Sequence, residues 1–130
     1  MILDTTFLLD VRHADTEAVS CARDLEASPE PLRVSAITLA ELQAGVPQVG
    51  SSLEEYSEIV DVTATKEIVP VTKSIARRGG RFHGELLADG TSVGLDDCLI
   101  AATAVEFEEP VVTRNVRHFE RIDGVLVREY

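Results

Sequence analysis

The feature that most constrains the fold is an alternation of short apolar runs with longer stretches of helical periodicity. The apolar runs are rich in β-branched residues without polar alternation, which indicates strands covered on both faces. Helical stretches between successive strands imply parallel strands joined by crossovers, and hence an α/β fold. We expect strands at residues 1–4, 32–35, 67–71, 110–113 and 125–128.

The helical segments are delimited by capping and breaking residues. Asp15 is predicted to cap the second helix, and Gly45 with Pro47 to end the third. Gly79 and Gly80 predict an interruption of the fifth helix. We expect helices at 5–12, 15–27, 37–44, from Ser51 or Ser52 to 63, at 73–88 and 95–106, and a short helical turn at 116–119.

Length and composition favour one domain over residues 1–130, with a hydrophobic fraction of 45% that suffices for a core. No apolar run approaches the roughly 20 residues of a membrane span. The N-terminus lacks the basic segment of a signal peptide, so we expect a cytoplasmic protein. Cys21 and Cys98 form neither CxxC nor a Cys/His cluster, and we expect them to be buried hydrophobes rather than zinc ligands.

The net charge of −11 repels nucleic acid at long range and argues against an RNA-binding function. That objection weakens if some carboxylates hold a divalent cation, which reverses the local field. It also weakens if the acidity reflects a high-salt cytoplasm, where repulsion is screened. The densest basic cluster, Arg77, Arg78 and Arg81, is either a solvated helix face or a contact for RNA phosphate or an acidic partner.

Several acids lie where α/β folds place their sites, beyond the carboxyl ends of strands. Asp4 ends the first strand and either caps the next helix or serves a site. Glu41 is either a carboxylate on a buried face or the partner of Thr38 in a capping box. Asp96 and Asp97 open the apolar helix, where acids complement the helix dipole. We expect at most one of these two to point into a shared cleft.

Asn115 follows the fourth strand and either makes an Asx-turn or offers an amide oxygen to a hard cation. A carboxylate cluster can hold Mg²⁺, which lowers the pKa of a water and offsets charge on a phosphodiester. His13, His83 and His118 are scattered along the chain, and we expect them at the surface or in partner contacts rather than in catalysis.

Four segments together resemble the motifs of PIN-domain nucleases, in that family's order. They are ILDTTFLLD at residues 2–10, VSAITLAEL at 34–42, DCLIAATA at 97–104 and VTRNVRHFERI at 112–122. The likeness extends over nearly the whole chain, and it is greatest to VapC-type toxins of toxin–antitoxin pairs. The resemblance implies a PIN-like three-layer sandwich, in which helices cover both faces of a central, mainly parallel sheet.

The resemblance also implies that acids converge to bind Mg²⁺, with Mn²⁺ as a substitute. Asp4, Glu41 and Asp97 match the family's three near-universal acids. Asn115 falls where many members place a fourth acid, so we expect one firmly bound metal ion. Asp96 is an additional acid that could partly replace the missing charge.

Further residues beside these motifs take secondary roles under the resemblance. Thr5 and Thr113 are candidates to support the acids, and Arg114 and Arg117 are candidates to contact RNA phosphate. The activity implied is that of an endoribonuclease toxin that hydrolyses RNA with a metal-activated water. Its expected partners are RNA, a cognate VapB-type antitoxin and a second copy of the chain in a homodimer.

Two other functions remain open to test. A non-catalytic PIN module would keep the fold in order to bind RNA or a protein partner, and Asn115 mildly favours it. A phosphoacceptor signalling domain also clusters acids at strand ends. It fits poorly, because no strand-end lysine occupies the expected late position and Glu41 lies within a helical segment.

Overall fold

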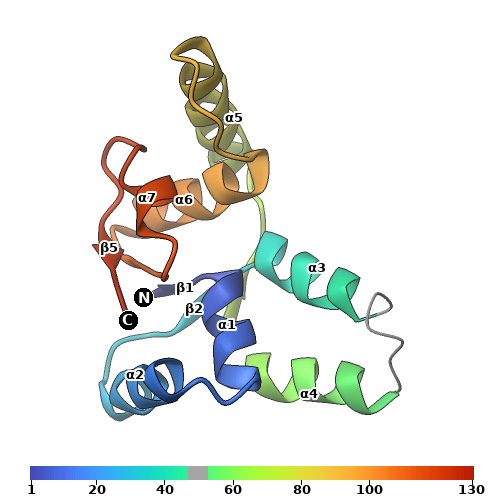
Figure 1. Cartoon of the computed structure of the whole chain (residues 1–130). Helices are drawn as coiled ribbons and strands as arrows, with labels where there is room; N and C mark the ends of the chain where they lie inside the picture. Colours follow the sequence, from blue (N-terminus) through green and yellow to red (C-terminus); the bar gives the residue numbers. More distant parts are fainter. Residues whose placement is uncertain (47–52) are drawn as a thin grey trace.

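The computed structural model describes residues 1–46 and 53–130 (Figure 1). In these residues, parallel strands form one sheet in the order β3-β2-β1-β4-β5. The α/β fold predicted from the sequence is therefore confirmed. The strands are β1 (Ile2–Leu3), β2 (Arg33–Ser35), β3 (Glu67–Val69), β4 (Val111–Val112) and β5 (Val127–Arg128). The helices are α1 (Thr5–Arg12), α2 (Thr16–Ala27), α3 (Ala36–Gly45), α4 (Leu53–Thr63), α5 (Lys73–Ala88), α6 (Leu95–Phe107) and α7 (Val116–Phe119).

The central strand β1 shows why the strands lack polar alternation. Ile2 pairs with Arg33 of β2 on one side and with Val111 of β4 on the other. Successive side chains of a strand point to opposite faces, so Ile2 joins the core beneath α5, α6 and α7, whereas Leu3 joins the core beneath α1, α2 and α4. Both residues are fully buried, because helices cover both faces of the sheet.

Most predicted boundaries agree with the structure to within a few residues. Asp15 caps α2 as expected, by accepting a hydrogen bond from Ala18 N at 3.0 Å. The strands are shorter than predicted, and the third ends at Val69 rather than at residue 71. The predicted stop at Pro47 and the predicted start at Ser51 or Ser52 lie outside the described residues.

The predicted interruption at Gly79 and Gly80 is wrong, because α5 is one continuous helix. A Cβ at position 79 would lie 2.7 Å from Leu99 Cδ2 and 3.1 Å from Leu99 Cα. Glycine therefore permits close packing of α5 on α6 rather than a break. Within the described residues, no helix is both long and apolar enough to cross a membrane.

The topology brings the ends of the middle strands together at one edge of the sheet. Asp4 follows β1, Ser35 ends β2, and Thr113 follows β4. The edge beyond these three strands is therefore the place where the predicted acids can meet.

The two cysteines are free thiols, of which Cys98 is buried and Cys21 is half-buried.

Candidate active site

Asp4 is a nearly buried carboxylate, 3% exposed, held between two elements at the end of β1. One oxygen accepts a hydrogen bond from Thr5 N at 2.8 Å, so that Asp4 caps α1. The other accepts from Thr113 Oγ1 at 2.7 Å. Burial, together with repulsion from Asp97, raises the pKa of Asp4 to about 6, although the hydrogen bond from Thr113 lowers it. Capping thus accounts for only one of its two oxygens.

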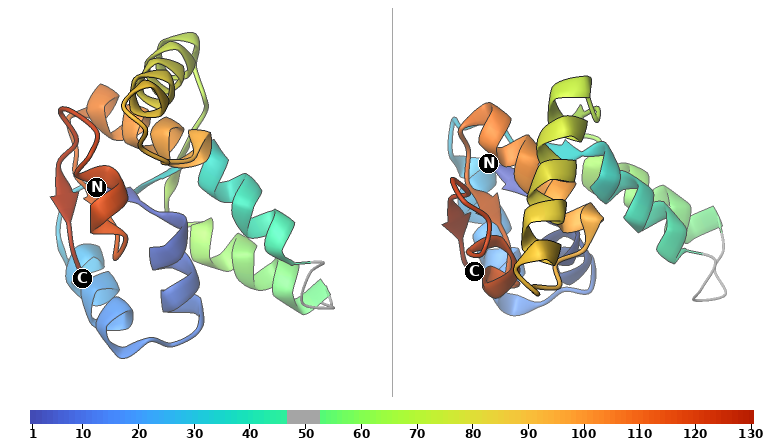
Figure 2. Two further views of the ribbon diagram at one scale, coloured as in Figure 1. Left: turned by 45° about the horizontal axis from the view of Figure 1, so that its top comes forward. Right: turned by 90° about the horizontal axis from the view of Figure 1, so that it is seen from above.

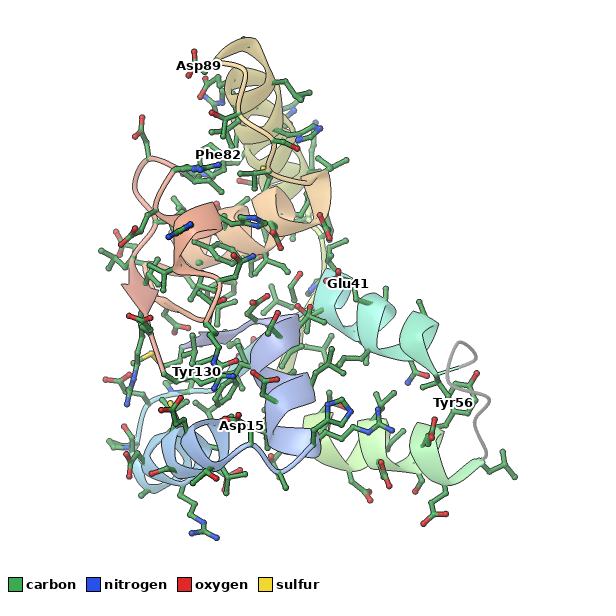
Figure 3. All side chains as sticks on the ribbon, in the orientation of Figure 1. Asp15, Glu41, Tyr56, Phe82, Asp89 and Tyr130 are labelled. Atoms are coloured by element: carbon green, nitrogen blue, oxygen red, sulfur yellow. The ribbon has the colours of Figure 1, made fainter. Side chains whose placement is uncertain are left out.

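Glu41 projects from α3 beside α1 and is labelled in Figure 3. The capping-box alternative is wrong, because Ser35 caps α3 and Thr38 lies buried inside the helix. Thr5 Oγ1 instead donates to Glu41 Oε1 at 2.7 Å. Burial and the neighbouring Asp96 raise the pKa of Glu41 to about 7. Tertiary contacts therefore hold this side chain beside the other acids, and we call Asp4, Glu41, Asp96 and Asp97 the acid cluster.

Two adjacent acids, Asp96 and Asp97, lie in the first turn of α6 and differ in their surroundings. Asp97 is half-buried, and burial raises its pKa, although a hydrogen bond with His118 opposes the rise. Asp96 is exposed, as expected for the second acid, yet its carboxylate shares a hydrogen bond with Glu41. Asp96 also folds back over Gly94, where a Cβ would clash with Asp96 Oδ1. Asp97 is thus the more buried of the two acids, and Asp96 adds negative charge beside Glu41 from the exposed side.

His118 is a site residue that sequence reasoning missed. Its Nδ1 lies 2.8 Å from Asp97 Oδ2 and 2.7 Å from Asn115 Nδ2. The available signal was its spacing, because residues three apart on a helical turn face the same side. Asn115 is held in turn by its backbone N–H, which donates to Thr113 Oγ1 at 2.9 Å. The structure therefore places His118 and Asn115 together beside Asp97.

The two threonines and two arginines expected near the site fall into different environments. Thr5 and Thr113 contact the acids directly. Arg114 instead turns toward acids of α1 and α2, 2.9 Å from Asp15 Oδ1, and lies over the Tyr130 ring at 4.8 Å. Arg117 is exposed and forms no ion pair with any residue that the structure describes. Contact with RNA phosphate remains a prediction for both arginines, and the geometry favours Arg117.

The donor set fits a hard divalent cation by charge and by atom type. Asp4, Glu41 and Asp97 all have raised pKa values, because buried carboxylates that repel one another disfavour ionisation. A divalent cation would relieve that repulsion, and carboxylate oxygens are ligands that Mg²⁺ and Mn²⁺ accept. As the side chains stand, no three of the His, Cys, Asp and Glu residues in 1–46 and 53–130 are close enough together to hold one ion.

Comparison with known proteins agrees with this fold. The family model described as PIN domain matches residues 1–125. Ribonuclease VapC10 from Mycobacterium tuberculosis is 34% identical over 113 residues, which cover 85% of this chain and 81% of that protein. Because both matches extend over most of the sequence, the chain belongs to the PIN-domain family and, within it, to the VapC-type proteins.

Solved structures give the same grouping. The structure of VapBC2 from Rickettsia felis, bound to a DNA fragment from its promoter, superposes with a TM-score of 0.88 at 25% identity, and covers 99% of this chain and 97% of that one. A toxin–antitoxin complex from Klebsiella pneumoniae superposes with a TM-score of 0.72 at 27% identity, with coverages of 99% and 98%. The predicted PIN-like sandwich is therefore confirmed.

Proposed function

We propose that this chain is a Mg²⁺-dependent endoribonuclease and the toxin of a type II toxin–antitoxin pair. One observation carries the proposal. Asp4, Glu41 and Asp97 are distant in sequence but belong to one group of carboxylates at the edge of a PIN sheet, and the pKa of each is raised. Burying carboxylates together costs folding free energy, and groups perturbed in this way are found preferentially at functional sites. The relatives named as ribonucleases support RNA as the substrate.

The side chains divide the work of binding and orientation. Asp4, Glu41 and Asp97 would hold Mg²⁺, or Mn²⁺ in its place, and Asp96 would supply part of the charge that Asn115 lacks. The chemistry that the cation supplies is a more acidic water and compensation of charge on the phosphoryl oxygens. Thr113 and Thr5 orient Asp4 and Glu41 through their hydroxyl groups. With one acid fewer than many relatives, we expect one firmly bound ion.

The test compares Asp4→Asn with the wild type on total cellular RNA in Mg²⁺. Asp24→Asn, an exposed acid on α2, is the matched control. Wild type and control should generate the same cleavage ends and inhibit growth on expression, whereas Asp4→Asn should do neither while it retains its circular dichroism spectrum. Cleavage by Asp4→Asn at the wild-type rate would refute the proposed site.

The partners follow from the same proposal. The structural neighbours are VapBC assemblies, which supports a VapB-type antitoxin as the cognate partner. We further propose that the chain forms a homodimer in the cytoplasm and that the antitoxin inhibits it. Light scattering of the chain alone tests the homodimer, and RNA cleavage with and without the cognate antitoxin tests the inhibition.

A non-catalytic PIN module is the second candidate. It is favoured by Asn115 in the position of an acid and by the open arrangement of the carboxylates. Calorimetric titration with Mg²⁺ and Mn²⁺ separates the two functions. Binding in the millimolar range or tighter, lost in Asp4→Asn, supports the nuclease, whereas no binding together with no cleavage of any RNA pool supports the module.

A further inference from the structure

The basic residues of this acidic chain are unevenly distributed. Of its 12 lysines and arginines, three lie on the outer face of α5, namely Lys73, Arg77 and Arg81. We call them the α5 basic stripe. All three are exposed, and none forms an ion pair with any residue in the described ranges. By contrast, Arg12, Arg33 and Arg114 each pair with two or more acids.

The stripe is regular in space as well as in sequence. Its residues are four apart, so they follow one side of the helix at steps of about 6 Å. Arg78 and Ser74 flank it, and these two side chains both turn toward Glu106 at the end of α6. Together the five side chains line a surface depression of about 440 Å³.

The fold itself gives no reason for this arrangement. Like charges four residues apart weaken a helix, and exposed glycines within a helix weaken it further. Gly80 and Gly84 nevertheless lie on the same outer face, where a Cβ at either position would meet nothing within 4 Å. The face therefore combines uncompensated positive charge with a bare helix backbone, which a ligand could approach closely.

The stripe lies on the side of α5 opposite Gly79, and it runs from beside the end of α6 toward the side of the fold where α6 begins. Gly79 packs against Leu99 and Cys98, and Cys98 directly follows Asp97. His83 Nδ1 lies 2.9 Å from the carbonyl oxygen of Val93, just before α6 begins. The two helices therefore run in opposite directions, and Arg81 is the member of the stripe nearest the start of α6. Both views of Figure 2 show α5 lying across α6.

We propose that the α5 basic stripe binds backbone phosphates of single-stranded RNA, in the part of the strand that extends beyond the acids at the start of α6. The inference rests on the proposed nuclease function and adds a substrate subsite to it. A phosphodiester strand offers negative charges in a regular series, which matches cations at steps of about 6 Å. A second copy of the chain is a poorer occupant, because a two-fold contact of α5 with α5 would bring two such stripes together.

The experiment measures RNA affinity in an Asp4→Asn background, so that the RNA stays intact. The probe is a fluorescein-labelled single-stranded RNA of about 20 nucleotides, long enough to span several phosphate contacts. Arg81→Gln is compared with Arg23→Gln, an exposed cation on α2 whose loss changes the net charge equally. Arg77→Gln/Arg81→Gln and Arg77→Lys/Arg81→Lys complete the set.

Each lost phosphate contact lowers the slope of log affinity against log salt by about 0.7. Arg81→Gln should therefore weaken RNA binding about 5-fold at 0.1 M salt, and the double glutamine variant about 25-fold. Arg23→Gln should bind as its parent does. The double lysine variant should recover most of the affinity, because lysine serves phosphate as a point charge.

Other outcomes overturn the inference. If wild type cleaves RNA but the double glutamine variant binds it like Arg23→Gln, the subsite is wrong and the nuclease function stands. If that variant keeps its RNA affinity but loses dimerisation, or loses binding to polyglutamate, the face serves a second copy or an acidic protein. If the chain neither binds nor cleaves RNA, the subsite and the proposed function fall together.

Discussion

Two groups of carboxylates in this protein have opposite electrostatic environments. Beside Arg114, the carboxylates of Asp10, Asp15 and Glu17 lie within 3.4 Å of guanidinium nitrogens. A backbone hydrogen bond from Ala18, followed by the hydrogen bond from Arg114, lowers the pKa of Asp15. In the acid cluster, Asp4, Glu41 and Asp97 meet hydroxyl groups, one imidazole and other carboxylates, and the pKa values of these three rise.

The contrast teaches which acids belong to the architecture and which are available for a function. Paired carboxylates near Arg114 and Tyr130 tie α1 and α2 to the C-terminal segment, and Asp15 and Tyr130 are labelled there in Figure 3. In the acid cluster the carboxylates repel one another, and no lysine or arginine in the described part of the chain pairs with them. Perturbed pKa values of this kind cluster at functional sites. Substitution of one acid in each group tests whether the two groups differ in this way.

The largest difference should appear in activity. Asp97→Asn removes a carboxylate from the acid cluster. RNA cleavage should fall by about 1,000-fold, in the range seen when a group that stabilises transition-state charge is lost. Asp15→Asn, the isosteric change in the paired group, should keep its rate within about twofold, since Asp15 lies among the structural ion pairs. Initial rates on one RNA substrate measure both. Equal losses of cleavage rate in the two variants would show that the two groups of acids do not differ in function.

The next effect concerns stability and its pH dependence without metal. The pKa of Asp4 is about 6 in the folded protein against an ordinary value of 3.8. Folding is therefore favoured while Asp4 is protonated, and it is penalised as pH rises through the folded value. At about 1.4 kcal/mol per pH unit, the penalty reaches about 3 kcal/mol above pH 6. Asp4→Asn should therefore raise the free energy of unfolding at about pH 7.5 in EDTA, and change it little at about pH 4.

Urea denaturation at the two pH values checks this prediction. Asn keeps an oxygen for Thr5 N and for capping α1, so the variant tests charge rather than the cap. Asp15→Asn is again the control, and it should lower the stability at neutral pH, because the pKa of Asp15 is depressed in the folded state. If Asp4→Asn is less stable than the wild type at about pH 7.5, the ionised carboxylate of Asp4 does not destabilise the fold, and the prediction is wrong.

His118 should have a smaller effect, through its contact with Asp97. Loss of a partner that orients a metal ligand typically weakens metal binding 10- to 100-fold. We expect His118→Ala to weaken Mn²⁺ binding by about tenfold, and His118→Gln, which retains a donor, to weaken it less. Calorimetry on the protein without RNA measures the affinity. Wild-type affinity in His118→Ala would exclude an orienting role for this residue.

The smallest effect separates the two arginines that flank the site. Arg117 is free of ion pairs with the described residues, so Arg117→Gln should raise KM for RNA about 5-fold at 0.1 M salt. Arg114→Gln should raise KM less and instead cost up to about 1 kcal/mol of stability, as exposed ion pairs do. A larger rise of KM for Arg114→Gln would show that its pairing with Asp15 opens when RNA binds.

The order of strands and helices could be predicted from local pattern alone. The turn at residues 116–119 agrees with α7, and the apolar strands agree with the sheet because helices cover both of its faces. The strands were overestimated in length, since apolar character continues past the last ladder hydrogen bond, as at Val71 after β3. The predicted interruption at Gly79 is wrong for a related reason. Whether a glycine ends a helix or allows a second helix to pack closely against it depends on residues that are distant in sequence.

The site shows the same division. The sequence by itself determined which oxygen-bearing side chains stand at strand ends and helix starts, and hence that Asp4, Glu41 and Asp97 are candidates. Only the tertiary structure decided that Thr5 binds Glu41, that His118 joins Asp97, and that Arg114 pairs with acids of α1 and α2. The physical reason is that propensity and capping act over a few residues, whereas burial, repulsion and pairing depend on elements that meet only when the sheet has formed.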